Sequence, residues 1–282
     1  MVLNRFDDFS LEVTAKDAAA IAQASLAIPA GTRVNVTYLG HETAQARVAT
    51  AQAIRQNDLL PVPHLSARRL VGEAELVEML TGLQAVDATR EVFVVGGDAE
   101  TPAGPYPDAL SLIRSDLLER HGVERVGIAG YPEGHPVIDD AVLWTALEDK
   151  LQELGRRDLP GSIITQFGFD ADAVLRWVEA LRDRGIEVPV SIGVSGPSSV
   201  RRLLAYARRF GVATSTSVAR KYGFSLVNLM SSAGPNRFIE TLAAGYEPSV
   251  HGDLGLHFYT FGGLTQTAEW LAGLRSAAGV LR

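Results

Sequence analysis

The chain contains no cysteine among its 282 residues, and its apolar runs are all short. Without cysteine, a disulfide framework, a thiolate nucleophile and a cysteine-ligated zinc or iron–sulfur site are excluded. No apolar run approaches the roughly 18 residues that a membrane-spanning helix needs, so we expect no membrane partner. Basic residues are too few for general nucleic-acid binding, because 26 of them stand against 33 acidic residues and the net charge is −7.

Recognisable nucleotide and metal motifs are absent from the sequence as well. No G-x-G-x-x-G sequence follows the first apolar run and no Walker A sequence occurs, so the chain predicts neither a Rossmann nor a P-loop nucleotide site. The six histidines show no H-x-x-x-H or H-E-x-x-H spacing, and we therefore predict no metal site. Residues 1–8 lack the apolar segment of a secretory signal, which favours a soluble cytoplasmic protein.

Short apolar runs rich in β-branched residues alternate with amphipathic stretches along the chain. The runs predicted as strands are Phe9–Thr14, Val34–Leu39, Leu59–Leu65, Val92–Val95, Val126–Ala129, Ile163–Phe167, Val188–Val194 and Leu256–Phe261. The stretches predicted as helices, from apolar residues at three- and four-residue spacing, are Ala18–Leu26, Ala44–Ile54, Ala74–Leu83, Ala109–Glu119, Val142–Leu154, Ala171–Arg182 and Val200–Arg209. Because parallel strands require a crossover between them, this alternation predicts a parallel sheet.

The predicted fold class is α/β, with a (β/α)8 TIM barrel formed by a single domain over residues 1–282. Such a barrel takes roughly 250 residues, and a hydrophobic content of 46% supplies a large core. The remaining length is assigned to a helical insertion before the last strand, Gly211–Ser249, with helices over Val218–Leu229 and Pro235–Ala244. A doubly wound open sheet is the alternative fold.

The predicted strand Val126–Ala129 runs into a dense group of functional side chains. Tyr131, Glu133 and His135 follow within a few residues, held by two prolines and a glycine. An aromatic ring, an acid and a base at the tip of a buried strand are typical of a ligand site at the C-terminal end of a barrel. Taken alone, the segment fits a polar surface turn equally well.

Other predicted strand ends deliver polar groups to the same end of the barrel. They are Thr37 and Tyr38, His64, Gly96-Gly97-Asp98, Thr165 and Gln166, and His257, Tyr259 and Thr260. Burial of a carboxyl group raises its pKa, so that the group can act as a general acid near neutral pH. Glu12, which interrupts the first strand, is therefore a candidate general acid, with a structural salt bridge as the alternative. For each residue alone a structural role is as good an interpretation, but their coincidence at one end predicts a shared site.

With these residues in hand, the chain resembles the methylenetetrahydrofolate reductase family, whose bacterial members are single flavin-binding (β/α)8 barrels of this length. The matching segments are Gly127–Pro136 (GIAGYPEGHP), Ile164–Asp170 (ITQFGFD) and His257–Thr260 (HFYT). Pro63-His64-Leu65, Val36-Thr37-Tyr38, Gly97-Asp98 and Glu12 also fall in the family's order. The likeness spans the whole chain, and the first two motifs together are specific.

The resemblance implies reduction of 5,10-methylenetetrahydrofolate to 5-methyltetrahydrofolate, an oxidoreductase step of one-carbon metabolism and methionine biosynthesis. NADH or NADPH would pass hydride to bound FAD and leave before folate binds, in a ping-pong order. In this reading Glu12 protonates the folate, Asp98 contacts the pterin and the flavin, and Gln166 holds folate. The residues that the resemblance implies for the FAD site are Thr37, His64, Gly97, Asp98, Tyr131, His135, Lys150 and Tyr259. The sequence leaves open whether the protein forms a homo-oligomer.

Three segments depart from the family's pattern. Gly96 stands where the family usually has arginine, and Gly196-Pro197-Ser198 stands where it has a phenylalanine that stacks on the substrate. The apolar segment Ala141–Leu147 replaces an aspartate and an asparagine that face the FAD ribose and pyrophosphate. Either other groups such as Arg114 or the backbone near Gly96 replace these contacts, or FAD binds loosely, or hydride passes directly from nicotinamide to folate. A pterin-binding methyltransferase and a folate-binding barrel without activity are the remaining alternatives.

Overall fold

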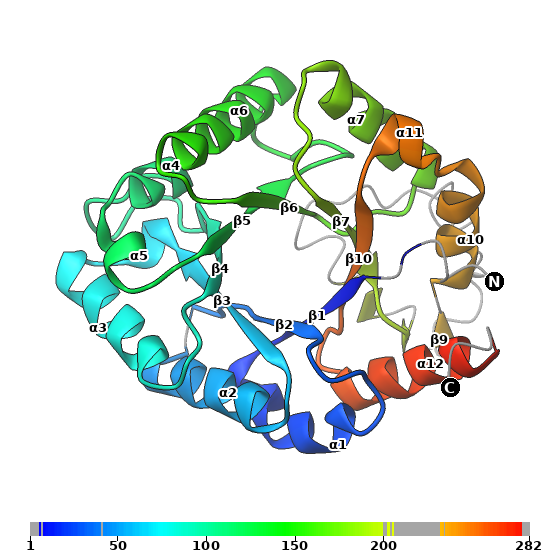
Figure 1. Ribbon diagram of the computed structural model, residues 1–282, viewed down its shortest axis with the longest axis horizontal. Helices are drawn as coiled ribbons and strands as arrows, with labels where there is room; N and C mark the ends of the chain where they lie inside the picture. Colours follow the sequence, from blue (N-terminus) through cyan, green and yellow to red (C-terminus); the bar gives the residue numbers. More distant parts are fainter. Residues whose placement is uncertain are drawn as a thin grey trace.

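The computed structural model describes residues 6, 8–40, 42–199, 202–203, 205, 232–233 and 235–277. Eight strands in this part of the chain close into a parallel barrel in the order β1-β10-β7-β6-β5-β4-β3-β2 (Figure 1). They are β1 (Phe9–Val13), β2 (Arg33–Val36), β3 (Leu60–Ser66), β4 (Glu91–Val95), β5 (Arg125–Gly130), β6 (Gly161–Thr165), β7 (Val190–Ser195) and β10 (Leu254–Tyr259). The closed barrel confirms the predicted (β/α)8 fold and excludes the open sheet.

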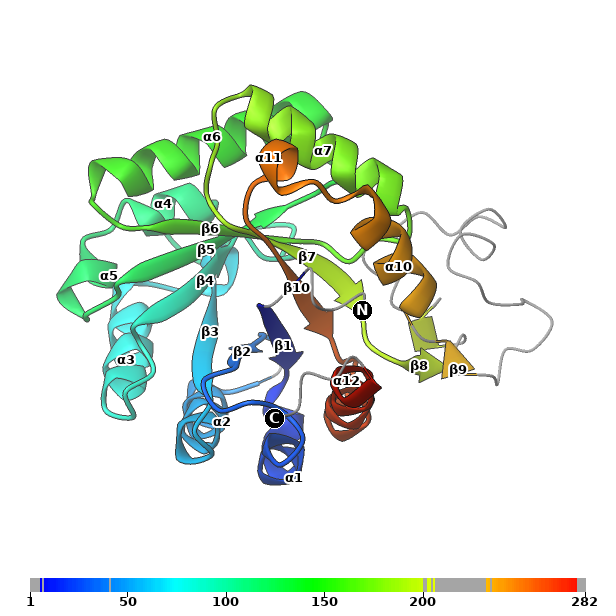
Figure 2. The same cartoon turned by 45° about the vertical axis from the view of Figure 1, so that its right-hand side comes forward.

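Helices surround the barrel on its outer side, as Figures 1 and 2 show from two directions. They are η2 (Ala15–Ala20), α1 (Ile21–Ser25), α2 (Ala44–Gln56), η3 (Ala67–Arg69), α3 (Glu73–Gln84), α4 (Ala109–Ile113), α5 (Leu117–Arg120), α6 (Asp140–Arg156), α7 (Ala171–Asp183), α10 (Asn236–Gly245), α11 (Pro248–His251) and α12 (Leu264–Ala277). The prediction of one helix over Ala109–Glu119 is wrong, because the chain breaks between α4 and α5. There the hydroxyl of Ser115 donates to the carbonyl of Leu112, which competes with continuation of the helix.

Several predicted strands end one to three residues too late. β2 ends at Val36, β6 ends at Thr165 and β10 ends at Tyr259, whereas the apolar runs continue beyond these points. Thr37 and Gln166 therefore lie in the loops directly after their strands. The Thr37 amide still donates to the carbonyl of Val13, and the Gln166 amide donates to that of Gly130, so both residues remain attached to the rim of the barrel.

The predicted insertion before the last strand is described only in part. Helix α10 matches the predicted helix Pro235–Ala244 with a shift of one residue, and the short α11 follows it directly. A small antiparallel sheet of β8 (Ser198–Ser199) and β9 (Ser232–Ala233), which the sequence pattern did not indicate, lies apart from the barrel. The predicted helix Val218–Leu229 lies outside the described residues, and Val200–Arg209 lies largely outside them.

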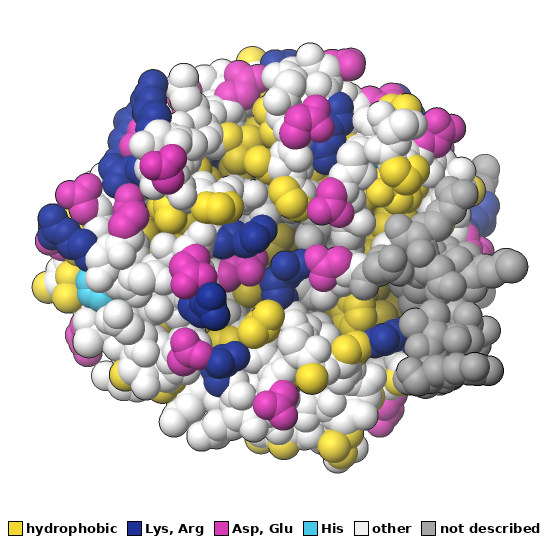
Figure 3. All heavy atoms as spheres, in the orientation of Figure 1, with side chains coloured by type: hydrophobic (Ala, Val, Ile, Leu, Met, Phe, Trp, Pro, Cys, Tyr) yellow, Lys and Arg dark blue, Asp and Glu magenta, His cyan; other side chains and the backbone are white. Residues whose placement is uncertain are grey.

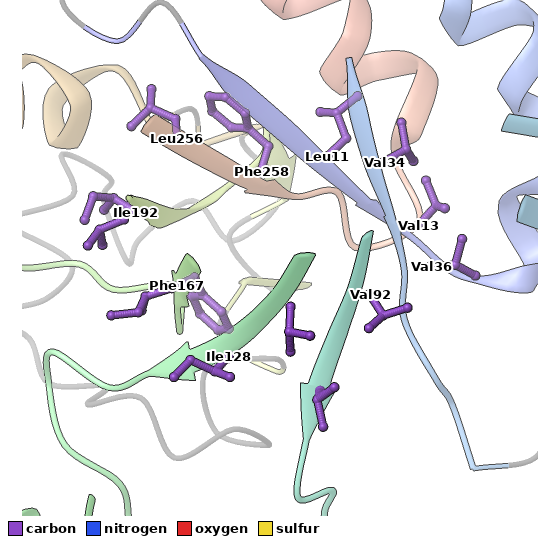
Figure 4. Packing of buried hydrophobic residues seen from close by; sticks show 14 of the residues in the cluster. Leu11, Val13, Val34, Val36, Val92, Ile128, Phe167, Ile192, Leu256 and Phe258 are labelled. Atoms are coloured by element: carbon purple, nitrogen blue, oxygen red, sulfur yellow. The ribbon is translucent and has the colours of Figure 1, made fainter. Parts of the chain in front are cut away.

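The buried apolar side chains of the strands form two separate clusters, one on the face toward the helices and one on the face toward the barrel interior. The large cluster lies between strands and helices and takes alternate residues of each strand, such as Leu11 and Val13 of β1 and Val34 and Val36 of β2 (Figure 4). The small cluster, Val62, Phe93 and Ile164 with Val95 and Ala129, comes from the opposite face of β3 to β6. Since side chains alternate along a strand, Ser10 and Glu12 share the interior face with this second cluster.

The strand starts carry a cluster of charges of both signs. Asp8 precedes β1 and forms an ion pair with Arg33 of β2, while Glu91 of β4 lies opposite Arg125 of β5. In Figure 3 acidic and basic side chains gather near the centre of the visible face. Burial raises the pKa of Glu91, and the charges of Arg33 and Arg125 oppose that rise. Among the described residues no helix is both long and apolar enough to cross a membrane.

Candidate active site

Glu12 lies inside the C-terminal end of the barrel between two histidines. Its side chain is 18% exposed, and its Oε2 atom lies 3.8 Å from Nε2 of His64 and 4.0 Å from Nε2 of His257. The two imidazoles come from β3 and β10, which flank the site from opposite directions in the strand order. Both distances exceed a hydrogen bond, so the carboxylate is close to both rings without being bound to either.

His64 is a neutral imidazole in this arrangement. Nδ2 of Asn35 lies 3.3 Å from Nε2 of His64, and an amide nitrogen can only donate, so this ring nitrogen accepts. Burial, with the nearby His257 and Arg47, lowers the pKa of His64 from 6.5 to about 3. The contact between His64 and Glu12 is therefore not an ion pair near neutral pH.

His257 is the second neighbour of Glu12 and is only 1% exposed. Its Nδ1 atom lies 2.7 Å from the hydroxyl oxygen of Ser10, which directs its Nε2 atom toward Glu12. The sequence predicts His257 at a strand end without a role, and it does not single out Ser10 or Asn35. Ser10 could have been found from the sequence, because side chains two residues apart in a strand lie on the same face and Ser10 precedes Glu12 by two residues.

Tyr259 and Tyr131 continue the wall of the site beyond Glu12. The Tyr259 hydroxyl donates to the carbonyl of Thr165 at 3.0 Å. Burial, together with the charges of Glu12 and Tyr131, raises the pKa of Tyr259 well above its ordinary value, so it stays a neutral phenol. The rings of Tyr131 and His135 meet edge to face at 5.4 Å between centroids. The structure thus brings Tyr131 and Tyr259 to the same side of the barrel as Glu12.

Glu133, the acid of the same loop, has a structural role. One of its carboxylate oxygens accepts from the amides of Phe169 at 2.7 Å and Asp170 at 3.0 Å. These amides lie in the loop between β6 and α7, directly after Gln166. Glu133 therefore ties the loop after β5 to the loop that carries Gln166, whose own side-chain oxygen accepts from the amide of Phe167 at 3.0 Å.

Lys150 lies on α6 with its ammonium group largely removed from water. Burial lowers the pKa of Lys150 to about 8, and the carboxylate of Asp108 opposes this effect. No hydrogen bond or ion pair joins Lys150 to residues 131–138 in the structure, so it does not contact the Tyr131–His135 loop through its charge. A cation in this position favours an anionic ligand. Arg114, by contrast, pairs with Glu153 of α6.

Gly97 and Asp98 follow the end of β4 and lie next to Arg69, which the sequence pattern did not single out. Gly97 has a φ of 92°, a conformation that favours glycine. Arg69, at the end of η3, donates from Nε to Oδ1 of Asp98 at 3.0 Å and from Nη2 to the same oxygen. The guanidinium beside Asp98 therefore comes from the neighbouring strand end, and not from residue 96, which is glycine.

Comparison with known proteins identifies the family. The model of the methylenetetrahydrofolate reductase family matches residues 18–271. The chain belongs to this family. The match covers β2 to β7 and β10, and hence the strand ends that carry His64, Asp98, Gln166 and Tyr259, whereas Glu12 precedes it. Across the described residues no cluster of three or more His, Asp or Glu side chains is arranged to hold a metal ion.

Individual relatives share only limited stretches with the chain. Methylenetetrahydrofolate reductase 1 of Schizosaccharomyces pombe is 32% identical over 116 residues, which are 40% of this chain and 18% of that relative. Methylenetetrahydrofolate reductase 2 of Saccharomyces cerevisiae is 36% identical over 70 residues, 24% of this chain and 11% of that relative. The chain therefore matches less than a fifth of the length of these curated relatives.

A solved structure supports the fold independently. The crystal structure of dihydropteroate synthase from Thermus thermophilus superposes with a TM-score of 0.51 and covers 96% of this chain and 93% of that one. The sequences are only 12% identical, so the likeness concerns the barrel alone.

Proposed function

We propose that the protein reduces 5,10-methylenetetrahydrofolate to 5-methyltetrahydrofolate with NADH or NADPH as electron donor, through bound FAD. The observation that carries this proposal is the carboxyl group of Glu12 inside the barrel mouth, flanked by His64 and His257, in a chain of this reductase family. Folate is the small-molecule substrate. A cytoplasmic location and a role in methionine biosynthesis belong to the same proposal.

Glu12 supplies the proton that opens the substrate. Protonation of the folate nitrogen breaks its bond to the bridging methylene carbon and leaves an iminium, which accepts hydride at that carbon and becomes the methyl group. The position of Glu12 supports this role, since its carboxyl group lies inside the barrel end and 3.8 Å from the neutral ring of His64. The Ser10–His257 pair, joined at 2.7 Å, holds the second imidazole beside Glu12.

Substrate positioning falls to the loops after β4 and β6. The carboxylate of Asp98 can accept hydrogen bonds from the N–H groups of a pterin ring, and the amide of Gln166 offers both a donor and an acceptor. The carboxylate of Glu133 and the guanidinium of Arg69 hold these two loops. Orientation of this kind lowers the entropic part of the barrier.

The residues around the loop after β5 partly fit FAD. The partly buried Lys150 has no hydrogen-bond acceptor in the described part of the chain, which suits a ligand phosphate. Tyr131, His135 and Gly97 offer two rings and a side-chain-free backbone to a flat ring system, with Thr37, His64 and Tyr259 at the neighbouring strand ends. Bound FAD would supply a hydride carrier between the nicotinamide and the folate.

One observation favours the second candidate, a flavin-independent reductase with direct hydride transfer. Around the start of α6, next to the exposed acids Asp139 and Asp140, two apolar side chains face solvent: Val137 is 84% exposed and Val142 is 56% exposed. Hydrogen bonds to a ribose need polar donors and acceptors, which these side chains lack. Lys150 can then serve the phosphates of the nicotinamide donor itself.

The test combines a spectrum with an assay. The purified protein should show the visible absorption of flavin, with or without added FAD, and should oxidise NADH or NADPH only when methylenetetrahydrofolate is present. Activity in a colourless protein that FAD does not stimulate would select the flavin-independent reductase. Absence of nicotinamide oxidation under both conditions would reject reduction and leave methyl transfer or plain folate binding.

A further inference from the structure

Two consecutive arginines in η3, directly after β3, hold the loop that follows β4. The guanidinium of Arg68 donates to the carbonyls of Ala99 at 2.7 Å, Pro107 at 3.1 Å and Glu100. The backbone of Arg68 also donates to Gly96 and accepts from Ala103, at 2.9 and 2.8 Å. Arg68 therefore fixes the course of the loop, and all of its partners there are backbone atoms of the loop.

Arg69 acts on a side chain of the same loop. Its Nε and Nη2 atoms both donate to Oδ1 of Asp98. The Arg69 side chain is 26% exposed, whereas that of Asp98 is 66% exposed. Arg69 is thus the less exposed partner of the pair, and its guanidinium reaches the more exposed carboxylate of Asp98.

Neighbouring loops hold the guanidinium of Arg69 in place. Its Cζ atom lies 5.4 Å from the centroid of the Tyr38 ring, which also receives Arg47 at 4.2 Å. Arg47 is buried and donates to the backbone carbonyl of His64 at 3.1 Å. At Gly40 a Cβ atom would overlap the Arg69 guanidinium. Arg69 therefore bridges the loops after β2, β3 and β4 and connects Asp98 with the strand end of His64.

We propose that Arg69 is a positioning residue for the reaction, which acts by orienting the Asp98 carboxylate toward the pterin of the folate. The inference rests on the proposed function, since it assumes that Asp98 binds folate. A guanidinium that donates two hydrogen bonds to one carboxylate oxygen fixes the direction of the carboxylate and so reduces the entropy lost on binding. Residue 96 cannot provide this hold, because it is glycine.

The test compares Arg69→Gln with Arg69→Lys and with Gly40→Ala, which displaces Arg69 without changing any charge. We expect Arg69→Gln to raise the KM for methylenetetrahydrofolate by about threefold to tenfold with a smaller change in kcat. Lysine should restore part of the loss, and Gly40→Ala should reproduce part of it. Arg90→Gln, which removes an exposed arginine–glutamate pair at the strand-start side, is the matched control.

A measurement of folate binding in the absence of turnover tests the role of Arg69 separately from the proposed reductase activity. Calorimetry with 5-methyltetrahydrofolate alone should show weaker binding to Arg69→Gln, with a thermal midpoint close to that of Arg90→Gln. In an Asp98→Asn background, Arg69→Gln should have no further effect on folate binding. Unchanged folate affinity in Arg69→Gln, or an equal loss in the Asp98→Asn background, would overturn the inference alone. A wild-type protein that binds folate but does not reduce it would overturn only the proposed function, and one that binds no folate would overturn both.

Discussion

The two ends of the barrel use ionisable side chains in opposite ways. At the strand starts, Asp8, Arg33, Glu91 and Arg125 form a cluster in which each acid has a base beside it. At the strand ends, two imidazoles lie near Glu12 but beyond hydrogen-bond distance, and those rings bond to Asn35 and Ser10 instead. The acids at the strand starts are therefore paired with bases, whereas the carboxyl group of Glu12 at the strand ends has no ion-pair partner bound to it among the described residues. A site for proton transfer requires such an available carboxyl group.

The largest effect should follow from removing the available carboxyl group. Replacing Glu12 with Gln keeps the size of the side chain and removes its proton, so folate reduction should fall by about 100-fold to 10,000-fold. Reduction of a bound flavin by nicotinamide, followed by the loss of visible absorption, should remain nearly intact because it needs no proton from Glu12. Glu124→Gln, an exposed change near the strand starts, is the control. If Glu12→Gln reduced folate at the wild-type rate, the proposed mechanism would be wrong.

The neutral His64 should make the strand-end side sensitive to acid. Its pKa falls from 6.5 to about 3 in the folded chain, so the unfolded chain binds the proton more tightly. The contribution of neutral His64 to stability is therefore complete above pH 6.5 and is lost as the pH falls toward 3. At about 1.4 kcal/mol per pKa unit, the free energy of unfolding should drop by about 2 kcal/mol between pH 6.5 and pH 5.

Two variants isolate this acid sensitivity from that of other groups. His64→Gln should flatten the fall in unfolding free energy over this pH interval, measured by urea denaturation. His121→Gln should leave the fall unchanged, because His121 lies at the end of α5 and bonds to the carbonyl of Leu117. Identical pH profiles for His64→Gln and the wild type would contradict a neutral, buried His64.

Lys150 gives a smaller effect that also depends on pH. Its pKa of about 8 means that the ammonium is charged at pH 7 and loses its charge as the pH rises through 8. Binding of FAD, or of NADPH in the flavin-independent case, should therefore weaken above pH 8. Lys150→Met should weaken this binding by about tenfold at pH 7 and remove the pH dependence. Lys16→Met, at an exposed position, should do neither, and a Lys150→Met profile parallel to the wild type would exclude Lys150 from the site.

The sequence predicted the barrel, and it placed at one end of the barrel several of the polar side chains that the structure brings there, because both follow from local patterns. Alternation of apolar runs and amphipathic stretches determines the fold class, and Glu12 is recognisable as an acid within an apolar strand. What the pattern does not contain is the register between strands, which sets Ser10 opposite His257 and Glu12 opposite Asn35. It also does not show the reach of long side chains, so it did not indicate that the guanidinium of Arg69 contacts Asp98. The break between α4 and α5 depends on one side-chain hydrogen bond that helical periodicity does not reveal.

The smallest effect should come from the strand starts, where Glu91→Gln removes a charge from the closed cluster. Burial disfavours the Glu91 carboxylate, while Arg33 and Arg125 favour it, so the two influences oppose each other. Arg33 keeps its ion pair with Asp8 in the variant. We therefore expect a change in unfolding free energy within about 1 kcal/mol and no change in kcat, because a paired charge of this kind contributes little net stability. A loss of folate reduction in Glu91→Gln comparable to that of Glu12→Gln would show that the two ends are coupled, and the contrast between them would fail.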